Sequence, residues 1–587
     1  MKKLFLISIL VAFFAQQGNT QQKISSKTLL QRTLKEKLRA PVEIEKALEQ
    51  QETHKTKKTR NSEIKLSPYT GNTHEEGEAF IAVNPNNSAQ LVLSYMDNNT
   101  TSGSLTYPIY YSNDYGLSWN KSSFDPLSVT AADYPGTIVI GGGDPVFAYD
   151  KNGKLYFSWI YLVAPMSFDT AIATMSWIYS NDNGATWNKE TNHTIGLSLI
   201  DVFTQDFLPG SDGFYDRQWF ATDLSNGSNA NSLYCSFVYF GTNSEPLSAS
   251  GMYVRKKPAS STSFNTSKQQ TFSGGSQFGN VAVDKNGVLH MSFADLDNNI
   301  VMHTKSTDGG SSWSTPVQVA TGTDLFGSQG GGYLHDRENS AVNLAIDGNN
   351  TIHIVWTNFN YTSSTVYNSY YAKSTNGGTT WSTPITISMV GRSTLMPTIC
   401  AFNNKVSIGA YAVDANKKSD YYVMTSYDNG GSWAAPIKVS TQENDFSING
   451  TSWYGDYYNA VRTNSDIYNI WSDARNNQGT KMYVSITNDY AVGLPDIIPV
   501  NAPFSVSNIY PNPIVSTLNV EVSASQDNAF TVQCRSIDGK IILSQQEKIT
   551  EGKNQFSMDM SSLAAGNYVL YIESEDGYKL SRKIAKQ

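Results

Sequence analysis

Acidic, arginine and aromatic side chains recur at one position of a repeated pattern in this 587-residue sequence. Each stands at the start of an apolar run that reads as a strand. Carboxylates act as general acids or bases, arginine binds carboxylates through two hydrogen bonds, and tyrosine acts as a nucleophile or packs against a sugar. Ion pairs between repeats would explain the same residues, so a structural and a functional interpretation both stay open. The residues are Glu75, Glu76, Glu78, Asp144, Asp216, Arg217, Asp336, Arg337, Glu338, Arg392, Trp453, Tyr454, Asp456, Tyr457 and Tyr458.

The strands that these residues introduce belong to a repeated hairpin. A pair of apolar runs around a polar turn occurs seven times, and the turns contain Asp, Asn and Gly, which accept hairpin backbone angles at low cost. The hairpins span residues 80–96, 145–160, 219–239, 281–293, 342–356, 397–411 and 457–471. Internal repeats of this length predict a propeller or a solenoid.

A second repeated motif, called the box here, follows most of the hairpins. It reads Ser-x-Asp-x-Gly-x-Ser/Thr-Trp, with Asn in place of Asp in one copy. The Asp is expected to accept hydrogen bonds from turn N–H groups, and the Trp to pack between neighbouring sheets, so the box is structural rather than catalytic. The Asp/Asn and Trp pairs are Asp114 and Trp119, Asp182 and Trp187, Asp308 and Trp313, Asn376 and Trp381, and Asp428 and Trp433.

A hairpin followed by a strand, a box turn and another strand makes a four-stranded blade. The sequence therefore predicts an all-β fold, a seven-bladed (alternatively six-bladed) β-propeller over residues 75–492. Hairpin turns and box turns share one face of such a fold, and the starts of the inner strands lie on the other face beside the channel, where ligand sites are favoured. Five boxes in register resemble the Asp-box, sialidase-like propellers, whose enzymes have six blades.

The resemblance implies a set of catalytic roles. Sialidases use a tyrosine nucleophile with a glutamate partner, an Asp acid/base and three arginines that hold the sugar carboxylate. Carried over, Asp144 is the acid/base, Glu338 the partner and Tyr457 the nucleophile. Arg217, Arg337 and Arg392 form the clamp; Arg217 replaces an arginine that the family has before its first box. The further substrate-binding residues are Asp216, Asp336, Asp456, Trp453 and Tyr454.

The C-terminal part differs from the repeats. Residues 493–504 read as a linker, and residues 505–587 as a small β-sandwich that opens on Tyr510-Pro511-Asn512-Pro513 and ends on a Leu-x-x-Gly-x-Tyr element at 563–568. These motifs resemble the type A sorting domain of the type IX secretion system of Bacteroidetes. The resemblance implies the secretion machinery as a partner and an exported protein, either released or held at the outer-membrane surface.

The N-terminus and the bulk composition agree with export. Residues 1–20 read as a signal peptide, because two lysines precede an apolar run too short to span a membrane, and residues 21–70 as a charged, partly helical or flexible leader. A net charge of -8 gives no sign of a nucleic-acid partner, and no later segment reads as a transmembrane span. Three widely spaced cysteines predict neither a disulfide framework nor a zinc site. No cofactor is expected; the acidic residues could bind Ca²⁺, but no calcium-loop spacing is present.

Two functions remain open on the sequence. The first is a secreted, sialidase-like glycoside hydrolase that acts on sialylated or other acidic glycans at the channel mouth. The alternative is a non-catalytic propeller that binds glycans or proteins at the cell surface, with aromatic side chains such as Trp453, Tyr454, Tyr457 and Tyr458 packing against sugars.

Overall fold

The structure, a computed structural model, describes residues 62–488 and 504–587. Within these ranges it leaves out 104, 125–128, 130–131, 168, 202, 205, 242–249, 323–324, 326–340, 360–366, 447–453, 476–478, 537–539 and 576–578. The predicted signal peptide, most of the predicted leader and nearly all of the predicted linker lie outside the described residues. Residues 62–431 and 438–487 belong to one compact unit, and residues 504–587 belong to another.

Seven sheets of four or five antiparallel strands make up the described part of the first unit. They are numbered here in chain order. Sheet 1 holds β2 (His74–Asn84), β3 (Asn87–Asn99), β4 (Leu105–Thr106), β5 (Ile109–Ser112) and β6 (Asn120–Lys121). Sheet 2 holds β7 (Thr137–Tyr149), β8 (Leu155–Pro165), β9 (Thr170–Ser180) and β10 (Thr194–Asp201). Sheet 3 holds β11 (Phe214–Thr222), β12 (Leu233–Phe240), β13 (Gly251–Lys257) and β14 (Gln269–Ser273). Sheet 4 holds β15 (Ser276–Val283), β16 (Leu289–Asp295), β17 (Ile300–Ser306) and β18 (Val317–Thr321).

The remaining three sheets repeat the same order. Sheet 5 holds β19 (Asn343–Ile346), β20 (Ile352–Asn358), β21 (Asn368–Ser374) and β22 (Ile385–Ile387). Sheet 6 holds β23 (Ser393–Phe402), β24 (Lys405–Val413), β25 (Lys418–Ser426), β26 (Ile437–Lys438) and β27 (Asn444–Asp445). Sheet 7 holds β28 (Ala460–Arg462), β29 (Asp466–Asp473), β30 (Lys481–Asn488) and, from the start of the chain, β1 (Ser62–Lys65).

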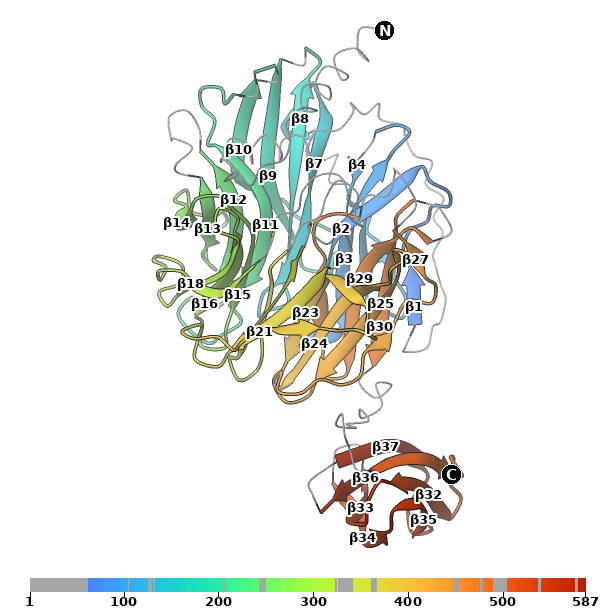
Figure 1. Cartoon of the computed structure of the whole chain (residues 1–587). Helices are drawn as coiled ribbons and strands as arrows, with labels where there is room; N and C mark the ends of the chain where they lie inside the picture. Colours follow the sequence, from blue (N-terminus) through green and yellow to red (C-terminus); the bar gives the residue numbers. More distant parts are fainter. Residues whose placement is uncertain are drawn as a thin grey trace. The chain divides into compact units, whose positions relative to one another are not determined.

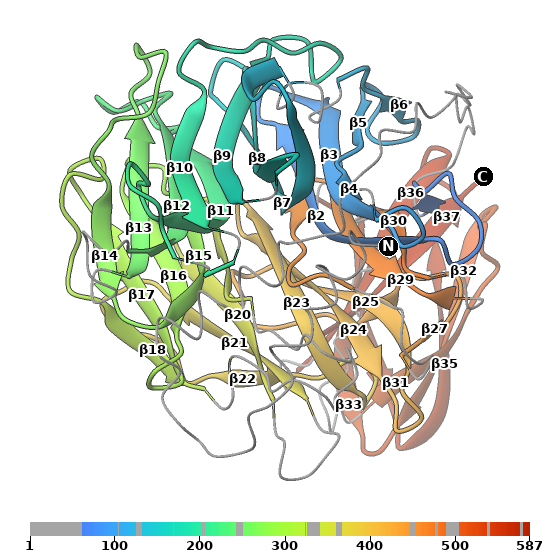
Figure 2. The ribbon, with the colours of Figure 1, turned by 90° about the horizontal axis from the view of Figure 1, so that it is seen from above.

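The sheets follow one another around a common axis (Figure 2). The first strand of each sheet packs against the first strand of the next, and β28 packs against β2, so the inner strands form a closed ring, the arrangement of a β-propeller. Apolar side chains fill the spaces between sheets, among them the fully buried Trp159, Trp177, Trp356 and Trp471. Figure 1 shows that the strands of sheet 2 are long, and β7 extends well beyond the level at which the inner strands meet.

The outer strand of sheet 7, β1, comes from residues that the sequence analysis assigned to the leader. β1 pairs with β30 from Ser62 opposite Ile486 to Lys65 opposite Tyr483. Glu63 holds it there, because its carboxylate accepts from the N–H of Thr441 at 2.8 Å and forms an ion pair with Arg475 at 2.5 Å. The charged leader therefore ends before Ser62, and the residues after it supply the outer strand of the last sheet.

An irregularity recurs near the start of the inner strands. Glu78, Asp144, Arg217, Phe278 and Met396 all have positive φ, between 48° and 61°. At each of these residues the register with the second strand of the sheet shifts, which is the signature of a β-bulge. A non-glycine residue in this region of φ costs of order 1–3 kcal/mol and persists only where its surroundings enforce it. The bulges thus recur at one position in five sheets, and three of these residues meet, because Arg217 contacts both Asp144 and Phe278.

The C-terminal unit is formed by two sheets. One contains β31 (Phe504–Tyr510), β32 (Thr517–Ala524) and β35 (Gly552–Asp559); the other contains β34 (Ile541–Ile549), β33 (Asn528–Ser536), β36 (Gly566–Ser574) and β37 (Lys579–Lys586). Alternating apolar side chains of both sheets, such as Val520, Val522, Phe530 and Ile572, form one buried core. Ser505 is the predicted first residue of this domain, and β31 begins one residue earlier.

Candidate functional site at the axis

Arg217 lies at the centre of a buried polar cluster. Its guanidinium contacts Asp456, which precedes β28 in sheet 7, and its Nε lies 3.5 Å from Asp216 Oδ2. The face of the guanidinium packs over the ring of Phe278, 4.7 Å from its centroid. The side chain of Arg217 is only 3% exposed, and both carboxylates are fully buried. The arginine thus joins sheets 3, 4 and 7 across the axis.

Asp144 joins sheet 2 to the same cluster. Its Oδ2 accepts a hydrogen bond from the N–H of Arg217 at 3.0 Å, and its backbone carbonyl accepts from the side-chain amide of Gln218. Asp144 is fully buried, and Glu78 is 1% exposed. Arg217 thus contacts Asp144, Asp216 and Asp456, and the charge of Glu78 acts on the neighbouring Tyr457. Acidic groups therefore outnumber basic ones among the described residues of the cluster.

Tyr457 lies beside the acids. Its ring meets Trp219 edge to face at 5.9 Å, and Trp219 meets Phe80 in the same way at 4.8 Å, so aromatic side chains of sheets 1, 3 and 7 pack together. The phenol hydroxyl is buried and has no hydrogen-bond partner among the described residues. Burial raises the pKa of Tyr457, and the charges of Asp144 and Glu78 raise it further.

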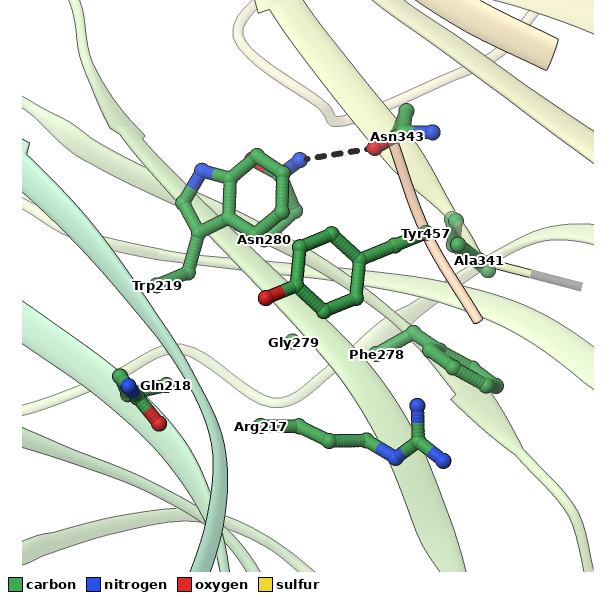
Figure 3. Close-up of a pocket in the computed structure, with 10 residues that line it drawn as sticks. Arg217, Gln218, Trp219, Phe278, Gly279, Asn280, Ala341, Asn343 and Tyr457 are labelled. Atoms are coloured by element: carbon green, nitrogen blue, oxygen red, sulfur yellow. Dashed lines mark hydrogen bonds between the residues drawn. The ribbon is translucent and has the colours of Figure 1, made fainter. Parts of the chain in front are cut away.

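The space left at the axis is small. Figure 3 shows Tyr457, Trp219, Asn280 and Asn343 around it, with Arg217 and Phe278 on one side. The cavity measures about 20 Å³, which is room for one water molecule but not for a sugar ring. Asn280 donates to Asn343 at 3.4 Å across its wall.

Several predicted site residues lie away from this cluster or outside the described residues. Arg392 pairs with Asp420 on β25 at 3.5 Å, and its side chain is 29% exposed, so Arg217 and Arg392 bind different carboxylates. Tyr454 is buried and donates to Asn444 at 2.9 Å. Asp336, Arg337, Glu338 and Trp453 lie outside the described residues.

The aromatic stacking surface expected from Tyr454, Tyr457 and Tyr458 is absent, because all three side chains are at most 5% exposed. The sequence placed these tyrosines at the start of an inner strand beside the channel, where ligand sites are favoured. In the structure Tyr454 and Tyr458 pack against Tyr411 of sheet 6, whereas Tyr457 packs against Trp219 of sheet 3. The hydroxyl of Tyr458 illustrates this, because it binds the backbone carbonyl of Tyr454.

The box turns form the hydrogen bonds that their residue types predict. Asp308 accepts from Ser306 Oγ at 2.7 Å and from the N–H of Ser312 at 2.9 Å. The Ser312 side chain and N–H lower the pKa of Asp308 to about 2, so it remains an ionised acceptor. In the fourth copy Asn376 accepts from the N–H of Thr380 at 3.0 Å, and its amide donates to Thr380 Oγ1 at 2.8 Å.

The sequence reasoning missed two groups of residues. At the axis it missed Gln218, Trp219 and Phe278. Phe278 occupies the same position in its repeat as Arg217 does, so an alignment of the repeats could have identified it. On the outside of sheet 2 it missed an ion-paired group around Asp133, which binds Lys189 at 2.5 Å and His193 at 2.7 Å. The connection that carries Asp133, residues 122–136, is long compared with residues 274–275 between β14 and β15. That length was the available signal.

Among the described residues, no group of three or more His, Cys, Asp or Glu side chains is placed to bind a metal ion. The acids at the axis surround a guanidinium instead, which supplies the positive charge that a cation would bring.

Comparison with solved structures finds weakly similar chains. A protein of unknown function from Dyadobacter fermentans is 11% identical, with a TM-score of 0.40, over 60% of this chain and 94% of its own. The Hadza microbial sialidase Hz136 is 13% identical, with a TM-score of 0.39, over 71% of this chain and 66% of its own. An α-L-arabinofuranosidase from Fusarium graminearum is 11% identical, with a TM-score of 0.36, over 71% of this chain and 94% of its own. No curated protein sequence matches the chain.

One part of the chain does match a family. Residues 508–587 match the secretion system C-terminal sorting domain, in agreement with the motifs of the sequence. This domain directs export through the type IX secretion system, to the cell surface or the medium, and it implies contact with that machinery. Within the described residues no helix is long and apolar enough to cross a membrane.

Proposed function

We propose that the chain is an exported, non-catalytic β-propeller that binds carbohydrate, with the seven sheets as its seven blades. The observation that carries the proposal is the state of Arg217. Its guanidinium is 3% exposed and engaged with Asp456 and Asp216, so it is ill-placed to clamp the carboxylate of an acidic sugar. The carbohydrate ligand comes from the resemblance of the box motifs to those of sialidase-like propellers.

The environment of Tyr457 supports binding over catalysis. A tyrosine nucleophile must lose its proton as it attacks, so a site favours it by lowering its pKa or by placing a base within hydrogen-bond reach. Here burial and the neighbouring charges of Asp144 and Glu78 raise the pKa of Tyr457. Its side chain is 5% exposed, and the adjoining cavity is too small for a pyranose.

A second candidate is the glycoside hydrolase itself, with Asp144 as acid/base, Tyr457 as nucleophile and Glu338 as its partner. One observation favours it. The hydroxyl of Tyr457 has no hydrogen-bond partner among the described residues and feels the charges of two carboxylic acids, Asp144 and Glu78. A rearrangement that opened the axis would give a substrate access to this hydroxyl.

Two measurements on the exported full chain separate the candidates. A glycan array tests binding, and release of a fluorophore from an α-sialoside and an α-L-arabinofuranoside tests hydrolysis. We expect array binding without turnover, unchanged in Tyr457→Phe. Turnover that disappears in Tyr457→Phe would establish the hydrolase instead. A folded protein with neither binding nor turnover would refute both candidates.

A further inference from the structure

Sheet 3 contains a turn with the spacing of a box, although the box residues are missing from its sequence. The N–H of Asn265 donates to the carbonyl of Lys256 at 2.8 Å. Across the box of sheet 4 the N–H of Ser314 donates to the carbonyl of Lys305, also at 2.8 Å. The separation along the chain is the same in both pairs, so the turn after β13 corresponds residue by residue to a box.

Lys257 occupies the position of the box serine in this turn. In sheet 4 that serine is Ser306, which donates to Asp308 at 2.7 Å and accepts from the N–H of Gly310 at 2.9 Å. Sheet 3 has Lys257 and Ala259 at the positions of Ser306 and Asp308, so its side chains cannot form the serine–aspartate bond. The exchange places an ammonium where the five boxes have a hydroxyl.

The ammonium of Lys257 is buried without a hydrogen-bond or ion-pair partner among the described residues. Lys257 is 3% exposed. Its Nζ lies 5.5 Å from the ring centroid of Tyr156 and 5.6 Å from that of Trp177, both in sheet 2. Cation–π attraction extends to about 6 Å, so these long contacts offset little of the cost of burying a charge. The three N–H donors of the ammonium therefore need an acceptor.

Lys154 brings a second ammonium to the same ring. Its Nζ lies 5.5 Å from the ring centroid of Tyr156 and 3.4 Å from that of Tyr179. It also forms no hydrogen bond or ion pair with the residues that the structure describes, and it is half-buried. Burial lowers the pKa of both lysines, and the charge of Lys154 lowers the pKa of Lys257 further. Two neighbouring cations without an acceptor are suited to hold an anion between them.

We propose that Lys154 and Lys257 bind a small monovalent anion, of the size of chloride, between sheets 2 and 3. The near-complete burial of Lys257 favours such an ion over a larger tetrahedral oxyanion. The indole of Trp177 adds a buried Nε1–H that has no acceptor in the described part of the chain. This site is independent of the carbohydrate binding proposed above.

Glu190 is the competing partner for the two lysines. Its charge raises the pKa of both, yet its carboxylate forms no ion pair with either of them in the residues described. Asp150 acts on both lysines as well, but its Oδ1 already accepts from the N–H groups of Asn152 at 2.8 Å and Lys154 at 2.9 Å. A Glu190 side chain that closed onto the lysines would take the place of the anion, so Glu190→Gln separates the two arrangements.

The test measures the NMR line width of chloride, which broadens on binding, in the presence of the full exported chain. Gluconate, a bulky anion, keeps the ionic strength constant. Lys257→Met keeps the length of the side chain and removes its charge. Lys256→Met is the matched control, because Lys256 already donates to Asn229 Oδ1 at 2.6 Å. We expect broadening by the native protein, loss of at least half of it in Lys257→Met, and no change in Lys256→Met or a gain in Glu190→Gln. Bromide should reverse the broadening at concentrations at which sulfate does not.

The contrary outcomes are distinct. Equal broadening by the native protein and by folded Lys257→Met would overturn the site. Broadening that appears only in Glu190→Gln would also overturn it, because the glutamate would then be the partner of the lysines in the native protein. Displacement by sulfate as readily as by bromide would overturn the restriction to a small monovalent anion. If Lys257→Met does not fold, Lys154→Met at its half-buried position carries the same expectation and the same refutation.

Discussion

Replacing Arg217 with methionine tests whether the axial cluster holds the ring together. Methionine keeps much of the length and apolar volume of the arginine but removes the positive charge that Arg217 presents to the buried Asp216 and Asp456. Breaking a buried ion pair by removing one partner costs about 3–5 kcal/mol. Both carboxylates are 0% exposed, and the cavity that Arg217 lines measures about 20 Å³. We therefore expect Arg217→Met to lower the free energy of unfolding by an amount in the upper half of that range.

Arg392→Met is the matched control, since both arginines belong to the predicted clamp. Arg392 is 29% exposed and its ion pair with Asp420 is long, so its loss should cost about 1 kcal/mol or less. Urea unfolding of the full chain at pH 7.5, followed by tryptophan fluorescence, measures both. The double variant Arg217→Met with Asp456→Asn should lose less than the sum of its single changes.

A loss below about 1 kcal/mol in Arg217→Met would refute this reasoning. It would mean that the carboxylates tolerate the missing arginine, and that Arg217 is held at the axis for a ligand rather than for the ring. A ligand-binding arginine gives the opposite pattern, in which stability is kept or improved while binding is lost.

Three further predictions concern the closure of the ring and the boxes. Burial, followed by the charge of Asp97, raises the pKa of Glu76 from 4.5 to about 8. The stability that this protonated carboxyl contributes is therefore complete below pH 4.5 and is lost as the pH rises towards 8. Over that interval the free energy of unfolding should fall by about 1.4 kcal/mol per pH unit. A pH series of unfolding midpoints should show this slope in the native protein and not in Glu76→Gln; equal slopes would contradict it. Glu63→Ala should loosen β1, and faster hydrogen exchange at residues 62–65 and 483–486, with the other sheets unchanged, would report it. Asn376→Asp should leave the melting temperature within about 1 °C, because a carboxylate accepts the same N–H bonds, whereas Asn376→Ala should lower stability by about 1 kcal/mol; equal effects of the two changes would contradict the structural role.

The sequence predicts what is local and misses what arises between distant segments. Turn residues and alternating apolar runs located the hairpins, because their partners are close in the chain. β1 could not be found in this way, since Ser62 pairs with Ile486 and four residues carry too little pattern to reveal a partner so far away. The sequence identified the charged residues before the inner strands by their residue types, but no sequence pattern predicts a positive φ at Glu78 or Arg217. Without those bulges the pairing of Arg217 with Asp456 cannot be derived.

The inner strands of the repeats must pack against one another, whereas the connections between repeats need only span the distance to the next strand. Long connections therefore have more freedom to vary than the axis has. At the axis Arg217 contacts Asp216 and Asp456, and the cavity that it lines measures only about 20 Å³. A connection of only two residues, such as 274–275, is fully used in joining two strands and has no further residues that could form a site. The connection of residues 122–136 is longer; it places Phe124 against the box tryptophan Trp187, and Asp133 pairs with Lys189 and His193. Changes in that connection should leave the ring intact, because the ion pairs at the axis and the strand β1 are formed by other residues.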